Sequence, residues 1–126
     1  VDLFLQTYGE FFNDEILGKN KFIRDLSKGN QKKVGIIGAL LGNPKVVILD
    51  EPFANLDPTT QIRLKKILRT IADTKQTTLL VSSHDLNHTF EISDRIVCFE
   101  RGSIIKDINT AEYSFEELTA FFDVVV

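Results

Sequence analysis

The chain has 126 residues, and its 15 basic and 18 acidic side chains give a formal net charge of -3. This length fits one domain, and the acidic balance argues against a protein that coats nucleic acid. The one cysteine, Cys98, cannot form an internal disulfide, which favours a reducing compartment. No segment approaches the roughly 18 apolar residues of a membrane span. Because the chain begins with Val1 rather than Met, we expect it to be processed or to be a piece of a longer protein.

Two helices are predicted in the first third of the chain. Apolar residues at helical spacing predict an amphipathic helix over the first dozen residues, with a face that packs in a core: Leu3, Phe4, Tyr8, Phe11 and Phe12. A short helix or turn and a loop follow over residues 13–25. The second helix begins after Ser27, a natural N-cap, and runs to about Leu41 before Gly42-Asn43-Pro44 ends it. Its N-terminus predicts an anion site, although an ordinary capped helix with solvated lysines is the alternative.

An apolar strand followed by two carboxylates lies near the middle of the sequence. Residues 46–49 are all apolar, which predicts a strand buried on both faces, as in parallel α/β sheets. Asp50 and Glu51 follow directly, and Pro52 ends the strand. Ligands of open α/β sheets bind outside the carboxyl ends of the strands, so both carboxylates stand where a substrate would bind. Such oxygen ligands suit Mg²⁺ and phosphoryl transfer, whereas the plainer interpretation is a solvated acidic turn.

A further helix and strand come next. Asp57 as N-cap, with Pro58 at the first helical position, predicts a helix that packs on the sheet through one apolar stripe. Residues 77–82 predict a second buried strand, which ends in Ser83-His84-Asp85. A helix between two strands makes them parallel, so we expect His84 on the same edge as the acidic pair. A lone histidine is more often structural, but this position favours a functional role.

The last third of the chain predicts architectural elements. A helix over residues 86–92 leads to a strand over residues 95–100, which forms an antiparallel hairpin with residues 103–107. Ser114 and Glu117 match a capping box, so a last helix is expected to run to about Phe122.

A phosphate-binding loop is missing from the sequence. Gly18-Lys19 invites comparison with the pattern G-x-x-x-x-G-K-[ST]. Asn13 stands where the pattern needs Gly, and Asn20 stands where it needs Ser or Thr. No other Gly-Lys pair occurs in the chain.

Four motifs in register resemble the second half of an ATP-binding cassette (ABC) ATPase, over about residues 22–108. They resemble the family's signature LSGGQ, Walker B strand, D-loop and switch histidine, and here they read Leu26-Ser27-Lys28-Gly29-Asn30, Val46–Glu51, Ala54–Asp57 and Ser83-His84-Asp85. Lys28 and Asn30 replace a Gly and a Gln of the signature. The resemblance implies a partial P-loop NTPase-like α/β fold with parallel strands and a C-terminal antiparallel hairpin. Residues 1–43 would be the end of the helical subdomain with the signature helix, and residues 44–126 the C-terminal part of the catalytic core.

The resemblance also implies roles for single residues. Asp50 would hold Mg²⁺, Glu51 would be the general base for the attacking water, and His84 would contact the γ-phosphate of ATP. The signature would bind the γ-phosphate of a nucleotide held by a second subunit, through Ser27, Lys28, Gly29 and Asn30. Asp57 would couple the two sites across that interface.

The implied function is that of the ATP-binding, ATP-hydrolysing subunit of an ABC transporter, which energises solute transport across a membrane. Its partners would be a second nucleotide-binding domain and transmembrane permease subunits, without nucleic acid, at the cytoplasmic face of the cell membrane. Because the family's Walker A loop lies outside this chain, we expect the chain alone to be inactive. Two alternatives are a non-transport ABC ATPase of the translation-factor or DNA-repair type, and a catalytically incomplete half-cassette that acts as an interaction module.

Overall fold

The computed structural model describes residues 6–12, 16, 18–74 and 77–125. Its helices and strands follow in the order α2 (Gly9–Phe12), η1 (Ile23–Asp25), α3 (Lys28–Leu40), β1 (Val46–Asp50), α4 (Pro58–Thr74), β2 (Thr78–Ser82), α5 (Leu86–Ile92), β3 (Arg95–Glu100), β4 (Ser103–Asn109), η2 (Thr110–Glu112) and α6 (Phe115–Val125). The chain divides into two compact units, Val1–Ser82 and Ser83–Val126. The boundary expected near residue 43, between the helical subdomain and the core, falls inside the first unit and stays a prediction.

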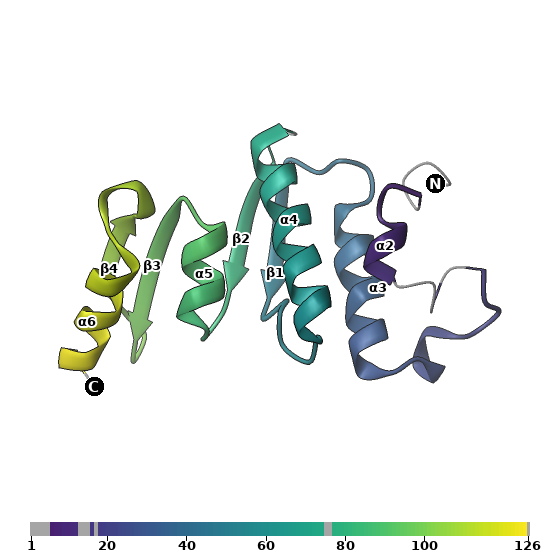
Figure 1. Cartoon of the computed structure of the whole chain (residues 1–126), viewed down its shortest axis with the longest axis horizontal. Helices are drawn as coiled ribbons and strands as arrows, with labels where there is room; N and C mark the ends of the chain where they lie inside the picture. Colours follow the sequence, from purple (N-terminus) through teal and green to yellow (C-terminus); the bar gives the residue numbers. More distant parts are fainter. Residues whose placement is uncertain (1–5, 13–15, 17, 75–76, 126) are drawn as a thin grey trace. The chain divides into compact units, whose positions relative to one another are not determined.

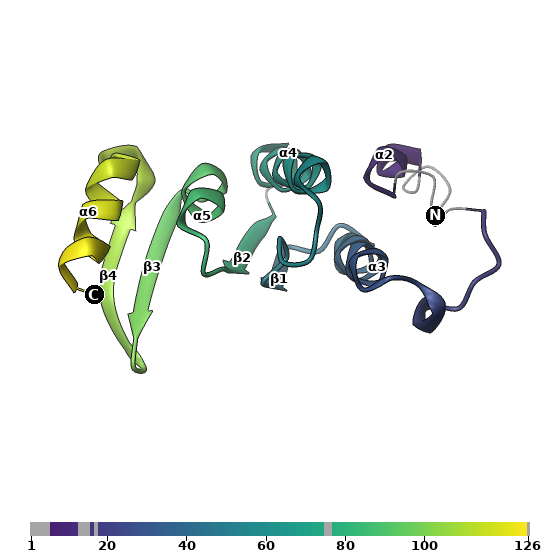
Figure 2. The ribbon, with the colours of Figure 1, turned by 60° about the horizontal axis from the view of Figure 1, so that its bottom comes forward.

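A two-stranded parallel sheet forms the middle of the first unit. β1 and β2 pair in register from Val46 with Thr78 to Asp50 with Ser82. Helix α4 lies over one face of this sheet (Figures 1 and 2), and its apolar stripe is buried through Leu64, Leu68 and Ile71. Helix α3 packs beside β1. The parallel pairing predicted from the helix between the strands is confirmed.

The other face of this sheet is exposed. Val47 and Leu49 are buried, whereas Val46 and Ile48 are 59% and 69% exposed. Leu80, which pairs with Ile48, is 62% exposed. The expectations that residues 46–49 are buried on both faces and that residues 77–82 form a second buried strand are therefore wrong for the part of the chain that the structure describes. An apolar run indicates that a strand can be buried on both faces, but it does not show that residues of the same chain bury both faces.

The helix starts of the first unit follow the predicted caps. Ser27 precedes α3, and its side chain accepts a hydrogen bond from the Asn30 amide at 3.2 Å. Asp57 precedes α4, which begins at Pro58 as expected. Both side chains satisfy amides that have no partner within their own helix. The capping residues of the sequence therefore predict where α3 and α4 begin.

The aromatic residues near the N-terminus lie in the core of the first unit. Tyr8, Phe11 and Phe12 are buried, in a segment where α2 contacts both α3 and α4. Leu3 and Phe4, the other residues of the face predicted to pack in a core, lie outside the described residues. None of the helices that the structure describes is long and apolar enough to cross a membrane.

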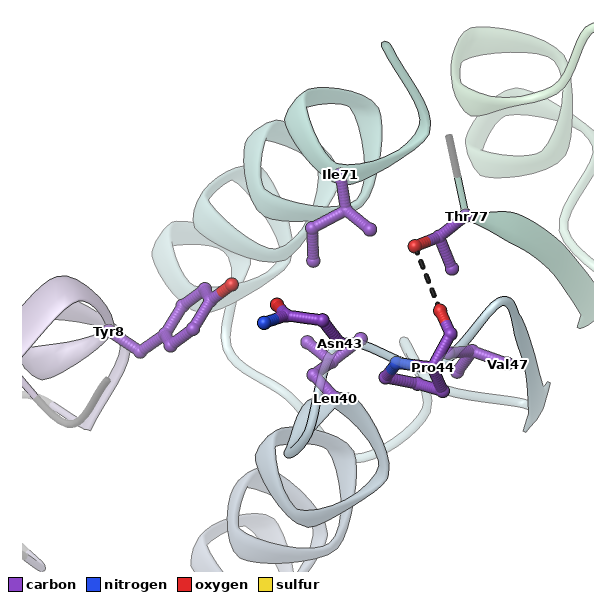
Figure 3. Close-up of a pocket in the computed structure, with 7 residues that line it drawn as sticks. All are labelled: Tyr8, Leu40, Asn43, Pro44, Val47, Ile71 and Thr77. Atoms are coloured by element: carbon purple, nitrogen blue, oxygen red, sulfur yellow. Dashed lines mark hydrogen bonds between the residues drawn. The ribbon is translucent and has the colours of Figure 1, made fainter. Parts of the chain in front are cut away.

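A small cavity lies where the two strands begin. Figure 3 shows Tyr8, Asn43 and Ile71 converging on it, with the Thr77 hydroxyl donating a 3.0 Å hydrogen bond to the Pro44 carbonyl. Its volume is about 10 Å³, which is room for about one water molecule. Because Pro44 and Thr77 precede β1 and β2, this cavity is at the opposite end of the strands from Asp50. It is a feature of packing and not a ligand site.

The second unit is an antiparallel hairpin with helices packed against it. β3 and β4 pair in antiparallel fashion, and the turn between them places Arg101 and Gly102 at φ values of 47° and 80°. Such left-handed turns match the twist of the flanking strands. In α6, Ser114 and Glu117 form both hydrogen bonds of the predicted capping box, at 2.7 and 3.1 Å. The core joins the hairpin to α6 through Ile96, Cys98, Ile108 and Leu118.

Candidate active site

At the carboxyl end of the parallel sheet, Ser82 binds the carboxylate of Asp50 and the backbone amide of Glu51. Asp50 and Ser82 are the last paired residues of β1 and β2, and the Ser82 hydroxyl donates to Asp50 Oδ1 at 2.5 Å. The Glu51 amide donates to the backbone oxygen of Ser82 at 3.1 Å and to its hydroxyl at 3.1 Å. This edge is where open α/β sheets bind ligands, and Asp50 and Glu51 are both present there, as predicted.

Glu51 has a backbone conformation that few side chains adopt. Its φ is 46°, in the left-handed region, which costs a residue with a Cβ atom on the order of 1 kcal/mol or more. The hydrogen bonds to Ser82 and one from the Lys32 ammonium to the Glu51 carbonyl hold this conformation. The turn redirects the chain directly after the strand, with the Glu51 residue half-buried.

The start of α3 meets the loop that precedes α4. A Cβ atom built on Gly29 would lie 3.1 Å from the Asn55 carbonyl oxygen, so only glycine allows this close approach without a shift. Beside this contact is an open hollow of about 340 Å³, lined by residues of both segments: Ser27, Gly29, Asn30, Lys33, Asn55, Leu56 and Asp57. The signature-like and D-loop-like residues, far apart in the sequence, thus share one surface. Lys28, the first residue of α3, is exposed.

Asp57 is held in its ionised form by its neighbours. Its carboxylate accepts hydrogen bonds from the Thr60 hydroxyl at 2.5 Å and from the Thr60 amide at 3.0 Å. These bonds lower the pKa of the Asp57 carboxyl, and the positive charge of Lys33 lowers it further. Lys33 is only 4% exposed, so the lining of the hollow includes a buried lysine and an exposed carboxylate.

His84 is exposed and lies in the second unit. The chain reaches it two residues after Ser82, the residue that pairs with Asp50. Its predicted approach to the acidic pair stays a prediction.

Three residues of this region were not among the predicted site residues. Lys32 donates from Nζ to the carbonyls of Glu51 and Ala54. Ser82 binds both carboxylate-bearing residues, and Thr60 binds Asp57. A signal for Ser82 was present, because it ends the second predicted strand and parallel strands bring their carboxyl ends to the same edge of a sheet. No spacing rule points from Lys32 to a loop 19 residues away.

The donor chemistry of this edge fits Mg²⁺ bound together with a phosphate. Among the residues that the structure describes, no group of three or more His, Cys, Asp and Glu side chains is placed to hold a metal ion. Mg²⁺ typically takes one or two carboxylates and completes its shell with substrate phosphates and water. Asp50, oriented by Ser82, offers one such carboxylate.

Comparison with known families identifies the family to which the chain belongs. Residues 9–88, more than half of the chain, match the family model described as "AAA domain, putative AbiEii toxin, Type IV TA system". The chain belongs to this AAA-type ATPase family. The ATPase segment includes the α3 start, the acidic strand end and the strand that carries Ser82.

Curated relatives of this ATPase segment are ATP-binding subunits. The chain is 32% identical over 96 residues to the cell division ATP-binding protein FtsE of Streptococcus pneumoniae, covering 76% of this chain and 41% of that protein. It is 36% identical over 97 residues to the phosphonates import ATP-binding protein PhnC of Thiobacillus denitrificans, covering 77% and 38%. It is 27% identical over 101 residues to the energy-coupling factor transporter ATP-binding protein EcfA2 of Staphylococcus aureus, covering 80% and 35%. The chain thus spans less than half the length of these relatives.

Solved structures show the same fold. The ATP-binding cassette MJ0796, in a dimeric post-hydrolysis state with ADP and Pi, aligns with a TM-score of 0.75 at 24% identity, covering 86% of this chain and 46% of that one. The fold class expected from the sequence, a partial ABC ATPase domain with parallel strands and an antiparallel hairpin, is confirmed. The family match, the relatives and the shared fold together support a partial ABC nucleotide-binding domain. These relatives favour neither a translation or DNA-repair ATPase nor a non-enzymatic half-cassette.

Proposed function

We propose that the complete protein is the ATP-binding subunit of an ABC transporter and hydrolyses ATP to drive solute across a membrane. The observation that carries this proposal is the edge at which Ser82 orients Asp50 and anchors Glu51. Relatives whose names specify phosphonate import and energy-coupling factor transport support the transport assignment. We place the protein on the cytoplasmic face of the membrane, bound to permease subunits.

Asp50 and Glu51 divide the chemistry of hydrolysis between them. Asp50 is the carboxylate that would hold Mg²⁺, which supplies charge neutralisation at the phosphate oxygens when it is bound. Glu51 is the general base that takes a proton from the attacking water. Its backbone is fixed on both sides, at the amide by Ser82 and at the carbonyl by Lys32. These bonds fix the part of the chain from which the carboxylate extends, and a fixed position is what proton transfer needs.

The hollow beside α3 binds the γ-phosphate of a nucleotide that a second nucleotide-binding domain holds. Its phosphate ligands are the helix start and its side chains, Ser27, Lys28, Gly29 and Asn30. A helix N-terminus attracts anions through its free amides and its dipole, and Lys28 adds an exposed positive charge. Asp57, on the same hollow, couples the two sites, and His84 contacts the γ-phosphate held by its own subunit.

Lys28→Glu in the complete protein tests this division of one site between two domains. A glutamate in the first turn suits the helix dipole, so α3 should stay folded, but the added carboxylate repels a triphosphate. We expect ATP-dependent dimerisation, measured by light scattering at several protein concentrations, to weaken at least about tenfold. Lys66→Glu, an exposed position on α4, is the matched control and should dimerise normally. Equal dimerisation of Lys28→Glu and the control would contradict the proposed phosphate site.

A further inference from the structure

The loop between Glu51 and Asp57 is held through its backbone carbonyl groups. The Lys32 ammonium donates to the carbonyls of Glu51 and Ala54, the latter at 3.1 Å. From the other helix, Gln61 Nε2 donates to the Phe53 carbonyl at 3.1 Å. The loop is therefore hydrogen-bonded to α3 through the charged ammonium of Lys32 and to α4 through the neutral amide of Gln61. Hydrogen bonds from charged donors are roughly twice as strong as neutral ones.

Lys32 also lies one helical turn beyond the α3 start. Gly29, three residues earlier on the same helix, lies so near the Asn55 carbonyl of the same loop that an added Cβ atom would be 3.1 Å from its oxygen. The start of α3 and the loop that begins at Glu51 are thus joined twice, once by the close packing at Gly29 and once by the hydrogen bonds of Lys32. Both contacts lie within the first unit.

We propose that Lys32 is a positioning residue that transmits the position of the α3 start to Glu51. This inference rests on the proposed function, in which α3 binds one nucleotide and Glu51 acts on the other. Lys32 binds the carbonyl of Glu51 itself, so a change in its position moves the backbone of the general base. The left-handed φ of 46° at Glu51 requires external support, and Lys32 and Ser82 supply it from opposite sides of that residue.

A general base must lie within hydrogen-bonding reach of its water, and small misplacements are costly. A shift of about 1 Å can lower a rate by about 10²-fold without changing how well the substrate binds. Lys32 makes its two bonds to backbone carbonyls, so it can affect the rate without itself touching a nucleotide. A merely structural role would lower stability and leave the chemistry of folded protein unchanged.

The test is a double-mutant cycle in the complete protein. Lys32→Met keeps most of the length of the side chain and removes the ammonium donor. If this variant does not fold, Lys32→Gln, which is also neutral, takes its place. Each variant is made with Glu51 intact and with Glu51→Gln. Lys66→Met, an exposed lysine of α4, is the matched control. Steady-state ATP hydrolysis, ATP titration and thermal unfolding are measured for every protein.

We expect Lys32→Met to lower kcat by about 10- to 100-fold, with the KM for ATP within about twofold of wild type. In the Glu51→Gln background the same change should lower the residual rate by less than about twofold, because residues that act as a unit are not additive. An equal fold-loss of the hydrolysis rate in both backgrounds, or a raised KM with unchanged kcat, would overturn the role proposed for Lys32. Neither result would affect the role proposed for Glu51. A wild-type rate for Glu51→Gln would overturn the role proposed for Glu51 and this inference with it.

Discussion

The hydroxyl of Ser82 donates a hydrogen bond to the carboxylate of Asp50 at the end of two paired parallel strands. The same hydroxyl accepts a bond from the amide of Glu51 at 3.1 Å. One small side chain thus orients the proposed magnesium ligand and anchors the proposed general base. Its effect on each can be measured separately.

Ser82→Ala should raise the Mg²⁺ concentration needed for half-maximal ATP hydrolysis by the complete protein. Removing a partner that orients a metal ligand typically weakens metal affinity by about 10- to 100-fold. Ser82→Thr, which keeps the hydroxyl, should need close to the wild-type Mg²⁺ concentration. A magnesium titration that is the same for Ser82→Ala and wild type would remove Ser82 from this role.

His84→Ala should lower turnover by about 10²-fold while ATP binding is retained. The reason is that a donor to the charged γ-phosphate acts mainly in the transition state. Asn87→Ala, an exposed position at the start of α5, is the control and should hydrolyse ATP normally. If His84→Ala hydrolyses ATP as fast as the control, the histidine is structural. The prediction that His84 lies on the same sheet edge as Asp50 and Glu51 then loses its main support.

Leu64→Ala should lower the free energy of unfolding by about 2–5 kcal/mol. Leu64 is 0% exposed on the stripe of α4 that covers the sheet, so its truncation leaves a cavity. Ile62 lies on the same helix and is 55% exposed, so Ile62→Ala should change stability by about 0.5 kcal/mol or less. Urea denaturation of both variants decides the point, and similar losses would show that α4 does not pack as described.

Asp57 should contribute to stability only above its lowered pKa. The hydrogen bonds from Thr60 lower the pKa of the folded carboxyl below its ordinary value of 3.8. Folding therefore favours the ionised form, and this contribution is lost as pH falls from 3.8 towards the folded pKa. We expect the difference in thermal stability between wild type and Asp57→Asn to be constant above about pH 5 and to shrink in more acidic buffer. A difference that does not change with pH would contradict the described bonds.

The caps and turns of this fold could be predicted because they depend on local sequence. Ser27, Asp57 and the Ser114–Glu117 capping box each satisfy amides within three residues, and each bond is present in the structure. Short-range hydrogen bonds of this kind are encoded by the residues that make them. The helix starts beside the candidate site were predictable for that reason.

The exposed sheet face and the Lys32 bonds could not be predicted from the sequence. Ile48 and Leu80 have the composition of buried strand residues, yet their exposure depends on what packs over them. Lys32 reads as a solvated helix lysine, and only the fold brings its ammonium to carbonyls 19 and 22 residues away. The partner of a long, flexible side chain cannot be predicted from the spacing of residues in the sequence.

ATP turnover by the complete protein carrying Glu51→Gln tests the central claim most directly. Glutamine keeps the size of the side chain but cannot take a proton from water. The proposed role predicts that turnover falls by about 10²- to 10⁴-fold, while ATP is bound as tightly as by wild type. Hydrolysis at the wild-type rate would contradict it.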